Sequence, residues 1–527
     1  MHQTKKTMKI YSISKDDTNI IKGVGILLIV LHNFFHWISP SPGENEFNFS
    51  SERIFYFFKE LYAYPGEVIN ILFSYFGHFG VQLFLFISGY GMTLSLLKKN
   101  MSWGGFLVTR LKKLYPLLFT GIVVFFVYTR LVDGIYLSKY AWQELSYKTL
   151  FVHTLLPKSG MGHIGPWWFF GLIFQLYVFF PFLLKIMQKY QWKGFLGICI
   201  LAYGTVLISQ FEFKELSEVP FLENAPGHLP EFCLGIYFAL NKDKNLHFFW
   251  LIGAILIFIL GNFFHIMYPL TFLSITTIFV FSYPSIKNGC ERFPRSIKPI
   301  LLHVGSISML LFATHTPIRN SLAQFYNTSS GAMMHLLGAI IYLIAIYCIA
   351  LISKLLYKAL VKLFSYIPTP TNTKNTLFEK IFFSAFCAFY AYVICFYVLS
   401  VKPLHTPEAA QPSTYCEQDT IDITNDYFVL ARYDINDNPR SIDMQVEFDY
   451  ESFSDEYPAV VFDISGLLWN DYSMGGEPNT GTKHYTYKYK FIRPVLKRVK
   501  GKQLSIIFRT KNEVHGEIKN VNIVVKK

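Results

Sequence analysis

A histidine follows a long apolar run near the start of this 527-residue chain. The segment from Gly23 to Leu31 has no polar side chain, and His32 comes next. At 1.5 Å per residue, a helix over residues 20–38 is long enough to cross a bilayer. An ionisable group inside such a helix is costly and indicates a functional site, where imidazole can act as a general base. The alternative is a neutral histidine hydrogen-bonded to a neighbouring helix.

A second histidine raises the question of a metal site. His36 lies four residues after His32, so both rings share a helix face, as in zinc-binding HExxH helices. The residue after His32 is Asn33 rather than glutamate, and no third ligand is evident nearby. We therefore expect no metal. His36 stands beside Trp37 near the predicted membrane surface, where a histidine costs little.

A basic pair opens the third apolar run. Arg110 and Lys113 are three residues apart, before Pro116, which a first helical turn tolerates. Their side chains would point the same way and suit the phosphates of a cytosolic anion. The alternative is that they only mark the cytoplasmic side of the membrane.

Composition indicates a polytopic membrane protein. The chain is 52% hydrophobic and only 16% charged, whereas soluble proteins have about a quarter of charged residues. The net charge of +13 comes from loops between apolar runs, so we expect no nucleic-acid partner. The segment Met1 to Lys15 is polar and basic, which argues against a cleavable signal peptide. Seven cysteines form no CxxC pair, so neither a zinc ribbon nor a disulfide framework is indicated.

Apolar runs predict about ten core transmembrane helices and one linking transmembrane helix. They lie near residues 20–38, 77–97, 114–132, 167–187, 193–210, 228–241, 247–264, 267–286, 300–320, 333–358 and 378–400. Lysine and arginine gather in alternate connections, and glutamates gather in others, such as Glu44, Glu46 and Glu52. Because basic loops stay in the cytoplasm, the N-terminus is expected inside and the C-terminus outside.

The C-terminal part is a different kind of protein. Prolines 403, 407 and 412 predict a stiff linker, and alternating apolar and polar residues beyond it predict an all-β sandwich or jelly roll. We expect a transmembrane domain over 1–365, a linking helix and linker over 366–414, and an extracytoplasmic β domain over 415–527. Its aromatic residues can stack on sugars, although tyrosines that alternate on a strand more often belong to a core. These residues are Trp469, Tyr485, Tyr487 and Tyr489.

Six motifs occur in a fixed order along the helical part. They are Lys22-Gly23 with His32; Phe84 to Ser88-Gly89-Tyr90; Arg110, Lys113 and Pro116; Trp168, Phe169, Tyr177 and Pro181; Phe232 with Gly235; and Gly305, Ser308 and His315. Together they resemble the membrane-bound acyltransferase 3 family from about Asn19 to Leu360. Two positions depart from the family: Lys113 replaces a second arginine and loses its bidentate geometry, and Lys15 precedes the first span where an arginine is usual.

The resemblance implies an integral membrane O-acyltransferase of the bacterial cytoplasmic (inner) membrane. It implies transfer of an acyl group, most often acetyl, from a cytosolic acyl-CoA to a hydroxyl of a cell-surface glycan. The only other partners expected are membrane lipids. The implied roles are a general base (His32), a histidine that orients it or stabilises charge (His315), CoA binding (Lys22, Arg110, Lys113) and substrate binding (Ser88, Trp167, Trp168, Tyr177). A covalent acyl-enzyme on His32 or Ser88, the oligomeric state and the exact acceptor stay open.

Two other functions fit parts of the pattern. Intramembrane histidines and broken helices also suit a proton-coupled exporter of a lipid-linked or acylated glycan. Inverted repeats would favour an exporter, and none is evident. Small residues and interfacial tryptophans, as at Ser88, Trp167 and Trp168, are also common in helix packing and at membrane surfaces. A non-catalytic envelope scaffold would need far fewer spans.

Overall fold

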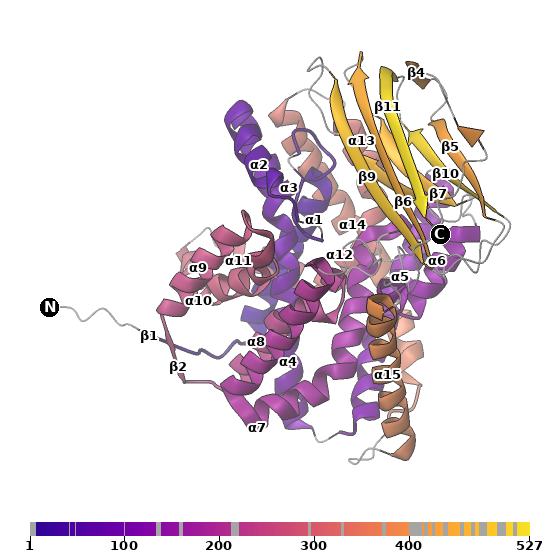
Figure 1. Ribbon diagram of the computed structural model, residues 1–527. Helices are drawn as coiled ribbons and strands as arrows, with labels where there is room; N and C mark the ends of the chain where they lie inside the picture. Colours follow the sequence, from indigo (N-terminus) through magenta and orange to yellow (C-terminus); the bar gives the residue numbers. More distant parts are fainter. Residues whose placement is uncertain are drawn as a thin grey trace. The chain divides into compact units, whose positions relative to one another are not determined.

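The computed structural model describes two units of the chain (Figure 1). The described ranges are 7–41, 43–47, 49–99, 101–132, 139–156, 162–211, 221–292, 297–327, 331–370, 376–399, 414–415, 420–423, 427–435, 441–453, 458–464, 469–473, 482–492, 502–509 and 514–526. The first unit is helical and lies within residues 1–211 and 219–388. The second contains the C-terminal strands. The predicted proline-rich linker lies outside the described residues.

The helical unit is built from fifteen described α-helices, the last of which continues into the second unit. They are α1 (Lys15–Phe35), α2 (Glu52–Ala63), α3 (Val68–Phe76), α4 (Gly80–Lys98), α5 (Trp103–Leu131), α6 (Lys139–Thr149), α7 (Trp168–Phe211), α8 (Ala225–Leu240), α9 (Phe249–Gly261), α10 (Leu270–Arg292), α11 (Ile297–Ser306), α12 (Ser308–Thr314), α13 (Thr316–Asn327), α14 (Ala332–Ser365) and α15 (Leu377–Leu399). Short 3₁₀ turns join some of them. They are η1 (Pro65–Glu67), η2 (Gly77–Phe79), η3 (His153–Leu155), η4 (Gly162–Trp167), η5 (Phe221–Glu223) and η6 (His265–Met267).

The structure confirms a multi-pass membrane protein. Each of the eleven apolar runs is helical, and six helical segments among the described residues are long and apolar enough to cross a membrane. The exact number of spans stays a prediction. Two runs differ from simple spans: α7 merges two of them across a break at Gln191, where φ is 52°, and residues 300–320 divide among α11, α12 and α13. A bend of 63° separates α11 from α12, and this pair can count as a seventh span.

Helix α1 packs against α4 and α11 through glycines. A Cβ atom on Gly23 would lie 2.5 Å from the carbonyl oxygen of Leu301 in α11. On the α4 side, a Cβ on Gly25 would lie 3.2 Å from the carbonyl oxygen of Gly80. Since helix backbones approach this closely only where a residue lacks a side chain, these glycines set the position of α1.

Several predicted cytoplasmic segments meet at one end of the helical unit. Strand β1 (Thr7–Lys9) pairs antiparallel with β2 (Asn245–His247), which follows α8. Ser14 and Asp17 form a capping box at the start of α1, and Asp17 also accepts a hydrogen bond from Tyr283 at 2.8 Å. The start of α1 therefore lies beside the end of α8 and the second half of α10, while the side of the membrane on which they lie stays a prediction.

The C-terminal unit contains two antiparallel sheets. One has the strand order β3 (Thr414–Tyr415), β5 (Tyr427–Ile435), β10 (Lys502–Arg509), β7 (Ala459–Ile464), β8 (Trp469–Ser473); the other has β4 (Thr420–Ile423), β11 (Val514–Lys526), β6 (Ser441–Ser452), β9 (Lys483–Ile492). Both sheets contribute to one apolar cluster, in which the rings of Phe448 and Phe508 meet edge to face at 5.2 Å. Tyr485 belongs to this core, whereas the side chains of Trp469 and Tyr489 lie outside the described part. A jelly-roll connectivity stays a prediction.

Candidate active site

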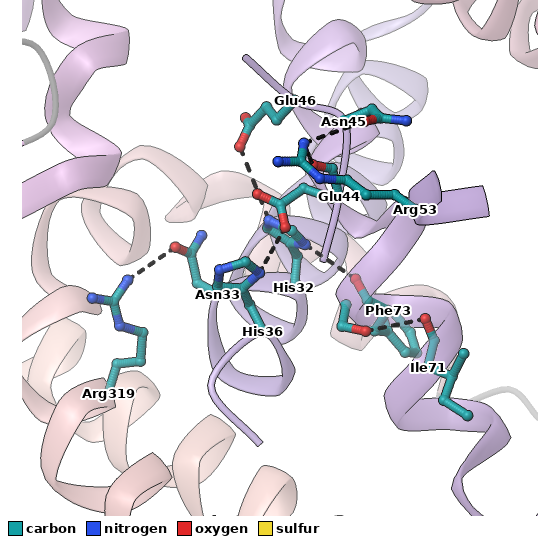
Figure 2. Close-up of polar contacts among 11 residues, drawn as sticks. His32, Asn33, His36, Glu44, Asn45, Glu46, Arg53, Ile71, Phe73 and Arg319 are labelled. Carbon is teal, nitrogen blue, oxygen red and sulfur yellow. Dashed lines mark hydrogen bonds and ion pairs between the residues drawn. The ribbon is translucent and has the colours of Figure 1, made fainter. Parts of the chain in front are cut away.

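His32 lies in the last turn of α1 and is 5% exposed. Its Nδ1 atom is 3.2 Å from the carbonyl oxygen of Phe73 in α3 (Figure 2). Because a carbonyl only accepts, a neutral imidazole carries its proton on Nδ1 and leaves a lone pair on Nε2. This Nε2 atom is 4.0 Å from a carboxyl oxygen of Glu46. The alternative drawn from the sequence, a histidine hydrogen-bonded to a neighbouring segment, thus holds for Nδ1 only. Nε2 can still accept a proton.

The segment that follows α1 folds back over His32. A carboxyl oxygen of Glu44 lies 2.7 Å from Nδ1 of His36 (Figure 2). Arg53 in α2 holds this segment: it donates to the backbone carbonyl of Glu44 and, at 3.2 Å, to the side chain of Asn45. The local fold therefore depends on an arginine in the next helix.

The carboxyl groups of Glu44 and Glu46, which lie near His32, have pKa values that the surroundings shift in opposite directions. Burial raises the pKa of Glu44, but the hydrogen bond to His36 and the electrostatic effect of His36 outweigh this effect and hold that pKa at about 2. Burial raises the pKa of Glu46 well above its ordinary value, and the charges of Glu44 and Glu223 raise it further. The pKa values of Glu44 and Glu46 are thus shifted in opposite directions, although both residues line the same cavity.

These residues line a cavity of about 400 Å³, the His32 cavity. Its lining comes from α1 and the following segment, from η2, α4, η4, α7, α12 and α13: Ile29, His32, Asn33, His36, Trp37, Glu44, Glu46, His78, Val81, Gly165, Pro166, Trp168, Phe169, Phe312 and Arg319. A volume of this size is typical of a small-molecule site. The polar groups are concentrated around His32.

Arg319 and Trp168 supply the other walls of the cavity. Arg319 in α13 donates to the side-chain oxygen of Asn33 at 3.1 Å, and its guanidinium lies 5.3 Å from the ring centre of Trp37. Trp168 stacks on His228 with 5.5 Å between ring centres, and His228 contacts Glu231 at 2.7 Å. The guanidinium of Arg319 and the ring of Trp168, both held by neighbouring side chains, thus border the cavity that contains His32.

Some of the predicted site residues line the cavity, and others do not. His32 and Trp168 line it together. Trp167 is fully buried and donates to the carbonyl of Ala313 at 3.3 Å, so it supports the wall from behind. His315 is also buried outside the lining; its Nδ1 is 2.8 Å from the carbonyl of Phe312, and it interacts electrostatically with Arg319. Ser88 and Tyr177 are not part of this cavity.

The predicted CoA-binding residues form a separate basic cluster. Lys22 and Lys113 lie close enough to repel each other, and Lys113 also interacts with Arg110 and Lys99. The Nε atom of Arg110 is buried and has no hydrogen-bond partner among the described residues, while Tyr177 lies near its charge. Unneutralised cations at close range suit a polyanion. Ten residues of α1, about 15 Å, separate Lys22 from His32.

Sequence reasoning missed four polar groups of the His32 cavity. Glu44 and Glu46 were interpreted only as loop charges, while His78 and Arg319 were not singled out. His78 lies between Gly77 and Gly80, and a Cβ on Gly77 would lie 2.6 Å from that of His32. Two glycines around a histidine at the start of an apolar run were therefore the available signal. For the glutamates, no local signal existed.

The comparisons with known proteins agree with this geometry. No curated protein and no solved structure matches the chain. A family model described as an acyltransferase domain, acyltransferase 3, matches residues 16–355. The matched part begins at the start of α1 and ends within α14, so it contains both the His32 cavity and the basic cluster. The chain therefore belongs to the acyltransferase 3 family of membrane acyltransferases.

Proposed function

We propose that the protein transfers an acyl group, most simply acetyl, from a cytosolic acyl-CoA to a hydroxyl group of an extracytoplasmic glycan. The protein would lie in a bacterial cytoplasmic membrane with the His32 cavity toward the outside. The observation that carries the proposal is the contact of His32 Nδ1 with the carbonyl oxygen of Phe73, which leaves Nε2 as the ring nitrogen on the side of Glu46, in the cavity that both residues line.

In the proposed reaction, His32 acts as general base. Its Nε2 takes the proton of the acceptor hydroxyl while the oxygen attacks the thioester carbonyl carbon. The new C–O bond forms, the C–S bond breaks, and the proton passes from His32 to the thiolate. The products are the glycan ester and free CoA, so atoms and charge balance.

The walls of the cavity suit this step. The tetrahedral intermediate carries a negative charge on oxygen, which Arg319 can stabilise. Trp168 offers a flat aromatic face for a sugar ring. His315 would act through Arg319 rather than on the substrate, since it lies behind the cavity wall.

The basic cluster suits the donor. Lys22, Arg110 and Lys113 lie near the opposite end of α1 from His32 and would hold the CoA phosphates. The thioester must then reach His32 along about 15 Å of helix. An extended pantetheine arm fits that requirement, while the C-terminal sheets would contact the glycan outside.

The test is mass spectrometry of surface glycans from a strain that lacks the protein, complemented with variants. His32→Ala is expected to leave the glycan without the acyl mass, and wild type to restore it. His303→Ala is the matched control, because His303 is exposed on α11 outside the His32 cavity. Full acylation with His32→Ala would refute the mechanism. Failure of the glycan to reach the surface would instead favour the exporter.

A further inference from the structure

Three side chains of the His32 cavity converge like metal ligands. One ring nitrogen each of His32 and His36 and a carboxyl oxygen of Glu44 all lie within 4.8 Å of one another (Figure 2). The two histidines are four residues apart on α1, and Glu44 comes from the segment that folds back. The sequence-based expectation of no metal rested on a missing third donor, and the fold brings Glu44 to that position.

The chemistry of the three donors favours zinc. Two imidazole nitrogens and one carboxylate oxygen are a donor set of zinc sites that keep one coordination position open. Calcium and magnesium prefer oxygen ligands alone. The contact between His32 and the carbonyl of Phe73 fixes the proton on Nδ1, so that Nε2 is the donor atom. The cavity leaves room for a fourth ligand.

The geometry requires a small adjustment. Tetrahedral zinc at ordinary bond lengths holds its ligand atoms about 3.3 Å apart. His36 and Glu44 are closer than this, at 2.7 Å, and the widest separation in the group is at most 4.8 Å. Rotation of the Glu44 carboxylate, which stands on a loop rather than a helix, opens the distance to His36.

We propose that the His32 cavity is a Zn²⁺ site formed by His32, His36 and Glu44, and that bound Zn²⁺ blocks acyl transfer. The metal takes the Nε2 lone pair that the general base needs, so the two states exclude each other. Metal binding is independent of the proposed function, whereas the block rests on it. The ion pair of His36 with Glu44 holds two of the ligands together when the metal is absent.

The binding test uses the full-length chain in detergent, purified with a tag that contains no histidine and stripped with a chelator. Zn²⁺ is added at neutral pH against a competing chromophoric chelator, and bound metal is measured by mass spectrometry. We expect about one Zn²⁺ per chain. Glu44→Gln and His36→Ala should each weaken binding at least tenfold, while His303→Ala should leave it unchanged. Visible d–d absorption of bound Co²⁺ gives a second readout for variants with low yield.

The outcomes separate the metal site from the enzyme reaction. Absence of stoichiometric Zn²⁺, or equal binding by wild type, Glu44→Gln and His36→Ala, would overturn the site. In an acyl-transfer assay, Zn²⁺ should inhibit wild type. Inhibition of the remaining activity of Glu44→Gln should require at least tenfold more Zn²⁺. Stoichiometric binding without inhibition would overturn the block alone. If no acyl transfer occurs even in the metal-free protein, the proposed function fails while a measured site still stands.

Discussion

The close approach of η2 to α1 makes Gly77→Ala an informative substitution. A Cβ at this position would lie 2.6 Å from Cβ of His32 and 2.8 Å from the carbonyl oxygen of Leu28. Carbon atoms in contact prefer separations of about 3.5–4.0 Å. The added methyl group must therefore push η2 and α1 apart by about 1 Å. Both partners of the new contact lie on helix α1 itself, so rotation of one flexible side chain does not relieve it.

The expected effects on stability and on rate differ in size. Overpacking of this kind costs about 1–3 kcal/mol. A shift of about 1 Å in a catalytic group lowers the rate about a hundredfold. The shift also weakens the contact of His32 with Phe73, which is already 3.2 Å long. We therefore expect a folded protein that is modestly less stable and nearly inactive.

The assay is transfer of labelled acetyl from acetyl-CoA to glycan in membrane vesicles, normalised to the amount of protein. Melting temperature in detergent measures the change in stability. Gly91→Ala is the control, because Gly91 lies in α4, within the same apolar helical segment Pro65–Lys98, and a Cβ there meets nothing within 4 Å. It should keep the wild-type rate and gain about 1 kcal/mol of helix stability. If Gly77→Ala keeps more than half of the wild-type rate, close packing does not position His32 and the reasoning is wrong.

Three further predictions concern charged groups. Arg110→Gln should raise the KM for acyl-CoA about ten- to a hundredfold with little change in kcat, because a charge-assisted hydrogen bond is worth about 1.5–3 kcal/mol; an unchanged KM would exclude Arg110 from the donor site. Lys113→Arg should lower that KM by restoring bidentate geometry, and a raised KM would argue against phosphate contact. Burial, partly offset by the charge of Lys148, raises the pKa of Glu223 to about 8. Above pH 4.5 the folded state therefore binds more protons than the unfolded chain. The free energy of unfolding then falls by up to about 1.4 kcal/mol per pH unit as pH rises to about 8. Glu223→Gln should flatten the fall in melting temperature over this range, and an unchanged slope would contradict the assignment.

The sequence predicts those features that depend on local pattern. Every apolar run is largely helical, because burial in lipid or protein requires apolar side chains and internally bonded backbone. The alternation at Val446 and Phe448 predicts a strand whose inward residues form a core, and the structure places both there. The prediction of His32 as a site residue also follows from local pattern, since it interrupts an apolar run.

The remaining features of the site depend on contacts between distant residues. Glu44 reaches His36 because Arg53, which lies in another helix, holds the backbone of the loop. Nothing in the loop sequence encodes that path. Likewise, the bend of 63° between α11 and α12 brings Phe312 to the cavity wall, whereas hydropathy alone predicts one continuous span. Hydropathy detects membrane depth but not the route of the backbone.

In the proposed reaction, the rigid placement of α1 would require an elongated donor. Gly23 and Gly25 lock the helix against α11 and α4, and Lys22 and His32 both belong to that locked segment. The distance between the basic cluster and the base is therefore set by helix rise, at about 15 Å, and no hinge within α1 shortens it. A short acyl donor bound at Lys22 would not reach His32. The acyl carrier must cover this distance itself, and a long flexible thioester arm anchored by phosphates meets that requirement.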